Sequence, residues 1–337
     1  MRPFTICSVA PFAIHNPVLV RILDLLEAVD ERRPDLLRVL TYHRVVEKDE
    51  DAPFSPGLTI SLPIFEQHAA YLSRHCHTLH IQDLLDASRA RSGLPPRSVL
   101  ITFDDAYQDF ADLAWPVLRR HALPVTLFVP TAFPDHPERV FWWDWLSEAF
   151  RLTARRDELD TPAGRFSLSA PAQRRSAYKR LRDYIKSLPN VRVSGVVDQI
   201  CSQLGVPQKG LPILSWDTLW ELTQRDVSLG AHTQTHPLMN RISLEEVRQE
   251  ISGSFGDLER KIGSTLPIFA YPGGELSDAV ARLLQEAGVE LGFTTRRGLN
   301  DFSTLDRLRI RRINIGQRTS LSILRAQLLA RSRSLYR

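Results

Sequence analysis

Hydrophobic residues follow two alternating patterns along the chain. The first is a short, almost uninterrupted apolar run, as in Val99–Phe103, Val125–Val129 and Val227–Ala231. Such runs are typical of parallel strands that are buried on both faces. The second is a longer segment in which apolar residues recur at helical spacing. The alternation of the two patterns predicts an α/β fold with a parallel sheet, either open or closed.

The individual elements can be predicted from these two patterns and from helix-capping signals. Strands are expected at residues 36–46, 99–103, 125–129, 227–231, 267–271, 291–295 and 308–315. Helices are expected at residues 17–29, 65–75, 109–121, 215–223, 243–262, 277–287 and 320–330.

One long segment interrupts the alternation. Residues 133–214 contain several prolines, many arginines and mixed helical patterns, but no buried-strand signal. We expect this segment to be a helical insertion. The chain is then divided into an N-terminal helical extension (residues 1–36), a main domain (37–316) and a C-terminal basic helix (317–337).

Composition identifies an ordinary soluble chain. Of 337 residues, 43% are hydrophobic and 24% are charged, and the formal net charge is +4. This charge is too small to indicate nucleic-acid binding. The three scattered cysteines, Cys7, Cys76 and Cys201, give no disulfide framework and fit a reducing compartment. The N-terminus lacks a signal-peptide pattern, and no apolar stretch approaches the roughly 20 residues of a membrane span. We therefore expect a cytoplasmic protein.

Candidate chemistry follows directly after two of the predicted strands. Asp104 and Asp105 follow Val99–Phe103, at the end of the strand where parallel barrels carry their active sites. Two adjacent carboxylates repel each other unless a cation or a proton intervenes. His232 and His236 follow another strand, and Pro237 favours a turn at the second histidine.

A histidine pair at this spacing is often no more than two surface residues, so the pair alone is weak evidence. Together with the carboxylates, however, it predicts a metal site. Two imidazoles and one carboxylate leave open positions on Zn²⁺ or a similar ion, which is typical of catalytic sites.

Other hydrolase and nucleotide-binding classes are disfavoured. No Glu follows His232, so the His-Glu-x-x-His motif of metalloproteases is absent. The chain contains neither a Gly-x-Ser-x-Gly nucleophile elbow nor a glycine-rich phosphate-binding loop.

Three motifs resemble those of the polysaccharide deacetylase family, carbohydrate esterase family 4. They are Thr-Phe-Asp104-Asp105, His232-Thr-Gln-Thr-His236 and Phe-Ala-Tyr271-Pro-Gly273-Gly, and the likeness covers roughly residues 38–315. The resemblance implies a distorted (β/α)7-type barrel with the helical insertion at residues 133–214. It also implies removal of acetyl groups from N-acetylated sugars with the help of a divalent metal.

The resemblance also implies roles for individual residues. Asp104 matches the general base, and Asp105, His232 and His236 match the metal ligands. The metal is expected to be Zn²⁺, with Co²⁺ and Ni²⁺ as alternatives.

The general acid is not found at its usual place. The family's late Leu-x-His motif is missing, and Arg311-Arg312-Ile-Asn-Ile stands there instead. Thr-Tyr42-His43-Arg resembles the N-terminal Tyr-His motif of the exopolysaccharide-deacetylase branch, whose histidine takes the acid's place. His43 is therefore the candidate acid, and Arg312 matches an arginine that this branch carries in a late strand. The alternative is that His43 is a core histidine, hydrogen-bonded at a strand end.

Further departures from the family pattern concern two loops. Ala106 replaces the glycine that commonly follows the Asp pair, so a positive φ there would be strained. In the third motif, Ala270 and Gly273 replace an arginine and a tyrosine. The arginine normally steers the base, and Arg312 is the candidate to replace it. Gly273 can still offer a backbone N–H to the oxyanion, and Tyr271 of the same motif is a further candidate residue for binding or orienting the substrate.

Aromatic residues of the insertion are candidates for sugar stacking. In Phe141-Trp-Trp143-Asp-Trp145, the aromatic rings are expected mainly to form the core of the insertion, although Trp143 or Trp145 could line the substrate cleft.

The sequence thus predicts a metal-dependent deacetylase of acetamido sugars in a polysaccharide or glycan precursor. The alternatives are a metal amidohydrolase acting on a small lipid- or nucleotide-linked N-acetyl sugar, and a non-catalytic glycan-binding descendant of the fold. From Arg307 to Arg337 the chain has nine arginines and no acidic residue. The last helix could therefore touch an anionic membrane surface, although an outer barrel helix accounts for the pattern more simply.

Overall fold

Seven parallel strands close into a ring. Their order around the ring is β1-β13-β11-β10-β9-β6-β5, and β5 pairs with β1 again. The fold is therefore an α/β barrel of the (β/α)7 type, as predicted, and not an open sheet. The strands are β1 (Leu36–Tyr42), β5 (Ser98–Phe103), β6 (Val125–Val129), β9 (Val227–Ala231), β10 (Ile268–Ala270), β11 (Leu291–Arg297) and β13 (Ile310–Asn314).

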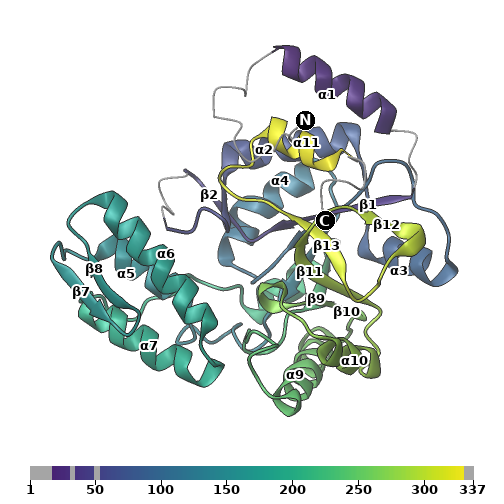
Figure 1. Cartoon of the computed structure of the whole chain (residues 1–337). Coiled ribbons are helices and arrows are strands. Elements are labelled where there is room, and N and C mark those ends of the chain that lie inside the picture. Colours follow the sequence, from purple (N-terminus) through teal and green to yellow (C-terminus); the bar gives the residue numbers. More distant parts are fainter. Residues whose placement is uncertain (1–16, 31–34, 49–53, 330–337) are drawn as a thin grey trace.

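The computed structural model describes residues 17–30, 35–48 and 54–329. Helices surround the barrel (Figure 1). They are α1 (Pro17–Asp30), α2 (Leu62–His75), α3 (Ile81–Ala90), α4 (Trp115–Arg120), α8 (Trp216–Thr223), α9 (Leu244–Ile262), α10 (Asp278–Glu286) and α11 (Leu321–Leu328). Short elements join them: β2 (Arg44–Val46), β3 (Thr59–Ser61), β4 (His77–Thr78), the π-helix η4 (Phe110–Ala114), the 3₁₀ turns η5 (Pro272–Gly274) and η6 (Phe302–Thr304), and β12 (Asn300–Asp301).

The alternation of side chains along each strand separates two cores. On β1, Leu37 and Val39 belong to a cluster inside the ring, which α3 also contacts. The intervening Leu40 and Tyr42 belong to a second cluster, which fills the space between the ring and the helices. Because side chains alternate with a period of two, every second side chain of a strand points into the ring, as far as the C-terminal mouth.

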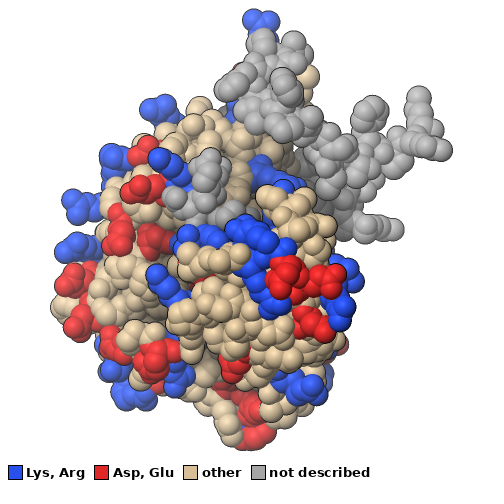
Figure 2. Space-filling view, turned by 90° about the vertical axis from the view of Figure 1, so that its left-hand side faces the viewer, with Lys and Arg blue, Asp and Glu red and all other residues tan. Residues whose placement is uncertain are grey.

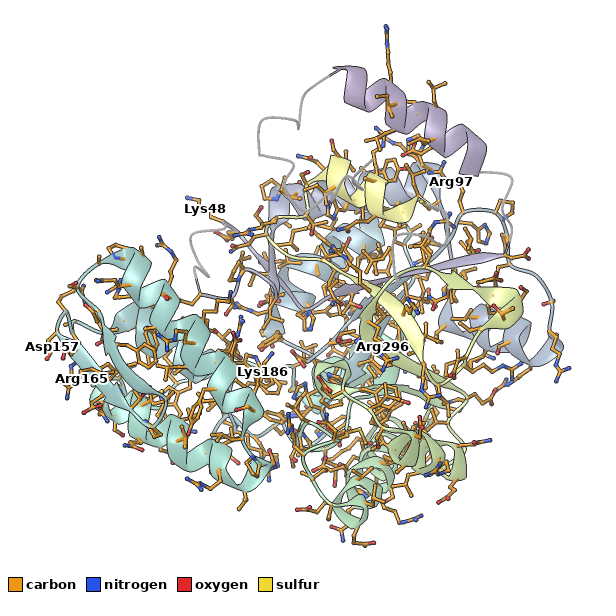
Figure 3. The ribbon with its side chains drawn as sticks, in the orientation of Figure 1. Lys48, Arg97, Asp157, Arg165, Lys186 and Arg296 are labelled. Carbon is orange, nitrogen blue, oxygen red and sulfur yellow. The ribbon has the colours of Figure 1, made fainter. Side chains whose placement is uncertain are left out.

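The insertion forms a lobe with its own core, which stands beside the barrel (Figure 1). Its elements are α5 (Trp142–Leu152), β7 (Glu158–Thr161), β8 (Gly164–Ser167), α6 (Pro171–Ser187) and α7 (Asn190–Gln203). Lys186 lies on the side of the lobe that faces the barrel, whereas Asp157 and Arg165 lie at its far end (Figure 3). The antiparallel β7–β8 hairpin was not expected, because these strands are short and largely exposed.

One aromatic side chain from the barrel enters the core of the lobe. Phe54, in the segment between β2 and β3, contacts the rings of Phe150 and Tyr178. The same segment is bound to the barrel, because Pro56 accepts a backbone hydrogen bond from Gln317. The lobe is therefore attached to the barrel by this segment as well as by its own two connections.

Several predicted elements have different bounds in the structure. The strand predicted at residues 36–46 is interrupted at His43, and its second part, β2, pairs with β3 in a separate sheet. The helix predicted at residues 109–121 begins with the π-helical turn η4. The N-terminal stretch 1–16, including Cys7, and residues 330–337 lie outside the described residues.

The two terminal helices pack against each other. Arg325 of α11 binds Asp24 and Glu27 of α1, and Leu324 and Leu328 are buried. Within the described residues, no helix is both long and apolar enough to cross a membrane. Figure 2, which faces the lobe, shows basic and acidic side chains interspersed on that surface.

Candidate active site

The predicted catalytic and metal-binding residues come together at the mouth of the barrel. Asp104 and Asp105 follow β5, His232 follows β9, and His43 follows β1. Asp104 extends the inner face of its strand, since the side chains of Leu100 and Thr102 precede it there. Parallel strands end at the same side of a barrel, so chemistry from distant parts of the sequence converges there.

Three side chains form a candidate metal centre. The Oδ1 atom of Asp105 lies 3.5 Å from Nε2 of His232 and 3.3 Å from Nε2 of His236. All three ligand atoms lie within 4.8 Å of one another. Two ligands about 2.1 Å from one ion at tetrahedral angles are separated by about 3.4 Å, which matches these contacts. Asp105 Oδ1 is buried and has no hydrogen-bond partner within the described part of the chain.

His232 is oriented by the neighbouring strand. Its Nδ1 lies 2.7 Å from the carbonyl oxygen of Ala270, at the end of β10. A carbonyl oxygen can only accept, so Nδ1 carries a proton, and in the neutral ring Nε2 presents its lone pair to the centre of the cluster. This hydrogen bond fixes the tautomer that a metal ligand requires.

His236 lies in a turn, as Pro237 suggested. Its backbone has φ of +59°, and its N–H donates to the hydroxyl oxygen of Thr233. Two aromatic rings lie against its side chain. The centre of the imidazole is 4.8 Å from the ring centre of Trp143 and 5.5 Å from that of Phe141. Its Nδ1 is buried without a hydrogen-bond partner among the residues described.

The electrostatics of the cluster favour an ionised carboxylate. Burial would raise the pKa of Asp105, but its contacts with His232 and His236 outweigh burial and hold the pKa below the usual range. Asp105 therefore offers a negatively charged oxygen to a cation.

The loop that carries the carboxylates is strained. Asp105 has φ of +74° and Ala106 has φ of +53°, a conformation that costs a residue with a Cβ roughly 1 kcal/mol or more. The alanine that replaces the family's usual glycine thus adopts the glycine-like backbone that the sequence suggested. The carbonyl oxygen of Ala106 accepts a hydrogen bond from the backbone of Leu214, which helps to hold this geometry.

Arg312 binds Asp104 in a bidentate pair. Its two terminal nitrogens lie 2.8 and 2.7 Å from the two carboxylate oxygens, and its Nε donates to the carbonyl oxygen of Thr294. Both side chains are buried, with exposures of 0% and 2%. Arg312 thus supplies Asp104 with a guanidinium partner, whereas Ala270 of the third motif offers none.

This pair controls the charge of Asp104. Burial would raise the pKa of Asp104, but the Arg312 guanidinium and the nearby histidines hold it below its ordinary value. The carboxylate is therefore ionised at neutral pH and able to accept a proton. Its oxygens remain oriented by the arginine.

His43 also lies beside Asp104. Its Nε2 is 3.9 Å from Asp104 Oδ2, too far for a hydrogen bond, and its Nδ1 is buried without a partner in the described structure. Burial lowers the pKa of His43, although Asp105 and Asp104 oppose this effect. The structure thus places His43 at the site and does not show the satisfied core histidine that was the alternative.

Tyr271 and Gly273 of the third motif occupy different positions relative to the cluster. The ring of Tyr271 is buried, and its hydroxyl donates to the carbonyl oxygen of Leu308, which precedes β13 and so lies toward the opposite end of the barrel. The side chain of Tyr271 is therefore not part of the cluster. Gly273 is exposed in the loop after β10, with φ of +62°.

Two residues beside the cluster were not found from the sequence. The hydroxyl of Tyr107 donates to Asp144 Oδ2 at 2.8 Å and accepts a hydrogen bond from Trp143 Nε1 at 3.0 Å. Burial raises the pKa of Asp144 to about 7. Tyr107 follows the Asp pair closely, but nothing in the sequence indicates a partner 37 residues later.

The chain is similar in sequence to a known protein family. A sequence profile described as polysaccharide deacetylase matches residues 91–292, more than half of the chain. The chain belongs to the polysaccharide deacetylase family. The matched segment of this deacetylase includes Asp104, Asp105, His232 and His236, whereas His43 and Arg312 lie outside it.

Solved structures share the deacetylase fold. A Streptococcus pyogenes deacetylase, PplD, in complex with acetate has a TM-score of 0.61 and 18% identity, covering 88% of this chain and 100% of that one. A de-N-acetylase from Aggregatibacter actinomycetemcomitans has a TM-score of 0.58 and 18% identity, covering 87% and 100%. The BpsB deacetylase domain from Bordetella bronchiseptica has a TM-score of 0.52 and 17% identity, covering 83% and 95%. No curated protein matches the deacetylase by sequence.

Proposed function

We propose that the protein is a metal-dependent N-deacetylase of acetamido sugars in a polysaccharide or glycan precursor. The observation that carries the proposal is the convergence of Asp105, His232 and His236 beside an ionised carboxylate, Asp104, that is held by Arg312. These five charged or metal-binding side chains, which come from three strands and the loops that follow them, would be costly to bury together without a function.

The ligand set suits a divalent ion, most simply Zn²⁺, because two neutral imidazoles and one carboxylate leave positions for water and substrate. When bound, such an ion supplies a water of lowered pKa and polarises a carbonyl group. The atoms that would hold it are Nε2 of His232, Nε2 of His236 and Oδ1 of Asp105.

Two side chains of the protein, Asp104 and His43, are proposed to carry out the proton transfers. Asp104 is the proposed general base, since it is ionised and lies beside the ligand cluster. His43 is the proposed general acid for the departing amine. Its lowered pKa makes the imidazolium a stronger proton donor. The backbone N–H of Gly273 is the proposed hydrogen-bond donor to the developing oxyanion.

The substrate side of the site has one described aromatic wall. Trp143 is half-buried, and its ring lies against that of the ligand His236. A ring in this position can pack against a sugar or its acetyl methyl group. A small lipid- or nucleotide-linked N-acetyl sugar is the second candidate substrate, because the third-motif tyrosine is replaced by Gly273 and stacking there is lost.

The test begins with the metal. We expect the purified protein to bind one divalent ion and to release acetate from N-acetylated sugars, and His232→Ala to lose both properties. The matched control is His136→Ala, which removes an exposed imidazole of the connection before α5 and should change neither. Metal content is measured by mass spectrometry and acetate by an enzymatic assay.

The substrate panel contains polymeric, lipid-linked and nucleotide-linked acetamido sugars, and the preferred member distinguishes the two candidate substrates. A wild-type protein that binds no divalent ion would contradict the proposal.

A further inference from the structure

We propose that Tyr107 is a positioning residue through which the helical lobe holds two metal ligands, Asp105 and His236, in place. This inference rests on the proposed function, because it concerns the same metal centre. It assigns the insertion a role in assembling that centre. Three groups of contacts support it.

The first group lies at the hydroxyl of Tyr107. Tyr107 is two residues after Asp105, in the same strained loop. Its hydroxyl is held by Asp144 and Trp143, the residues at the start of α5, and both of its hydrogen-bonding roles are used. The carboxylate-bearing loop of the barrel is thus tied to the first turn of the lobe.

The second group involves the ring and backbone of this loop. The guanidinium of Arg44 lies 5.3 Å from the centre of the Tyr107 ring, and Arg44 is fixed in turn by Asp109. Along the backbone, Tyr107 forms a bridge with Ile213, and the amide of Gln108 donates to the carbonyl of Pro212. The returning end of the insertion therefore contacts the same loop as its outgoing end.

The third group concerns His236. Metal-binding histidines are normally oriented by a hydrogen bond at the second ring nitrogen, and His232 has one from Nδ1 to Ala270. His236 Nδ1 has no such partner in the described part of the chain. The rings of Trp143 and Phe141 lie against it instead. Ring contacts from the lobe thus take the place of the missing hydrogen bond.

These contacts meet at one point. Trp143 packs on His236 and donates to Tyr107, while Tyr107 belongs to the loop of Asp105. Loss of the Tyr107 hydroxyl should therefore loosen one ligand through its loop and the other through the tryptophan. Outer contacts of this kind typically change metal affinity by about 10- to 100-fold.

The experiment measures the metal site directly. Tyr107→Phe, which removes only the hydroxyl, should weaken Zn²⁺ binding by about 10- to 100-fold in calorimetric titration with the metal alone. It should also alter the visible absorption spectrum of the Co²⁺-loaded protein, which reports ligand geometry. Tyr184→Phe removes a hydroxyl from α6 of the same lobe and should leave both readouts unchanged.

Two further variants separate positioning from a loss of folding. Asp144→Asn keeps an oxygen that can accept from Tyr107, so its loss of Zn²⁺ affinity should be smaller than that of Asp144→Leu. Trp143→Leu removes the half-buried ring from His236 and should also weaken Zn²⁺ binding. This variant tests the inference independently if Tyr107→Phe does not fold.

The outcomes distinguish this inference from the proposed function. Folded Tyr107→Phe and Trp143→Leu proteins that bind Zn²⁺ with wild-type affinity and give a wild-type Co²⁺ spectrum would overturn the positioning role alone. A wild-type protein that binds neither metal would overturn the proposed function, and the positioning role with it.

Discussion

At the scale of single residues, the pair formed by Asp104 and Arg312 shows how one interaction can be supplied from another strand. The third motif has Ala270 where the family usually has an arginine, yet the carboxylate still has a guanidinium partner. That partner comes from β13, which lies two strands away from β10 in the ring. The guanidinium bound to Asp104 is thus supplied by β13 and not by the third motif.

This pair leads to a prediction about pH dependence. Arg312 lowers the pKa of Asp104 against the effect of burial, so Arg312→Met should raise that pKa. A base works only when deprotonated, so the acid limb of kcat/KM should move to higher pH, with a larger activity loss at about pH 6 than at about pH 8. The measurement is a pH–rate profile.

The control for that profile is Arg311→Met, the same substitution at the exposed neighbouring position of β13. Leaving the buried carboxylate unpaired should also reduce the free energy of unfolding by about 3–5 kcal/mol. An acid limb at the wild-type pH in Arg312→Met would show that the arginine does not control the base.

The sequence predicted this site unevenly, for physical reasons. Asp105, His232 and His236 could be brought together because each follows a predicted strand, and parallel strands end at one side. Arg312 was recognised only through the resemblance, since an arginine in a strand gives no local signal of its partner. The Tyr107–Asp144 bond escaped prediction because it depends on how the insertion folds back onto the barrel.

At the scale of elements, the turn after β10 depends on its glycines. Gly274 has φ of +73°, and a Cβ there would overlap the backbone nitrogen and hydroxyl of Thr295 on β11. The close approach allows Thr295 to donate to the carbonyl oxygen of Gly273. The turn thereby holds Gly273, the proposed oxyanion donor, at the edge of the mouth.

Gly274→Ala should therefore destabilise the protein, because the new methyl group adds both strain and overlap. We expect a loss of more than about 1 kcal/mol in the free energy of unfolding, measured by denaturant titration. Gly195→Ala is the matched control. Gly195 is exposed in α7 with no atom near its missing Cβ, so alanine should stabilise the helix by up to about 1 kcal/mol. Equal stability of the two variants would refute the assigned role of Gly274.

Elements with a clear hydrophobic pattern were predicted better than elements with a short or ambiguous one. The buried strand β6 has the predicted bounds, because a short run of apolar residues between two prolines strongly favours a buried strand. The break at His43 was missed, because the residues on both sides of it have β character. Helix α3 was also missed: it is only ten residues long, and half of them are polar.

At the scale of the whole molecule, the described end of the β2–β3 segment joins the barrel to the core of the lobe. Phe54 is 7% exposed and contacts two aromatic residues of the lobe core, while Ser55 beside it lies 3.3 Å from Ser147 of α5, hydroxyl to hydroxyl. Attachment at this point fixes the lobe relative to the mouth of the barrel.

Phe54→Ala should weaken this attachment. Removing a buried phenylalanine costs about 3–5 kcal/mol, and we expect the loss to appear as faster hydrogen exchange in α5 and α6 with little change in the ring strands. Val191→Ala, at a position of the same lobe that is 85% exposed, should change exchange very little. Uniform acceleration throughout the protein would indicate that lobe and barrel unfold as one unit.

Closure of the ring also has a consequence for biosynthesis. The strand that completes the ring, β13, is the last to be translated, and it occupies the place between β1 and β11. Until it leaves the ribosome, two neighbouring strands have unpaired edges and Asp104 has no guanidinium partner. The lobe, whose core is almost wholly encoded between residues 140 and 206, can form earlier in translation. Asp104 of the nascent chain is therefore paired with its guanidinium only after the lobe and the other six strands of the ring have been made.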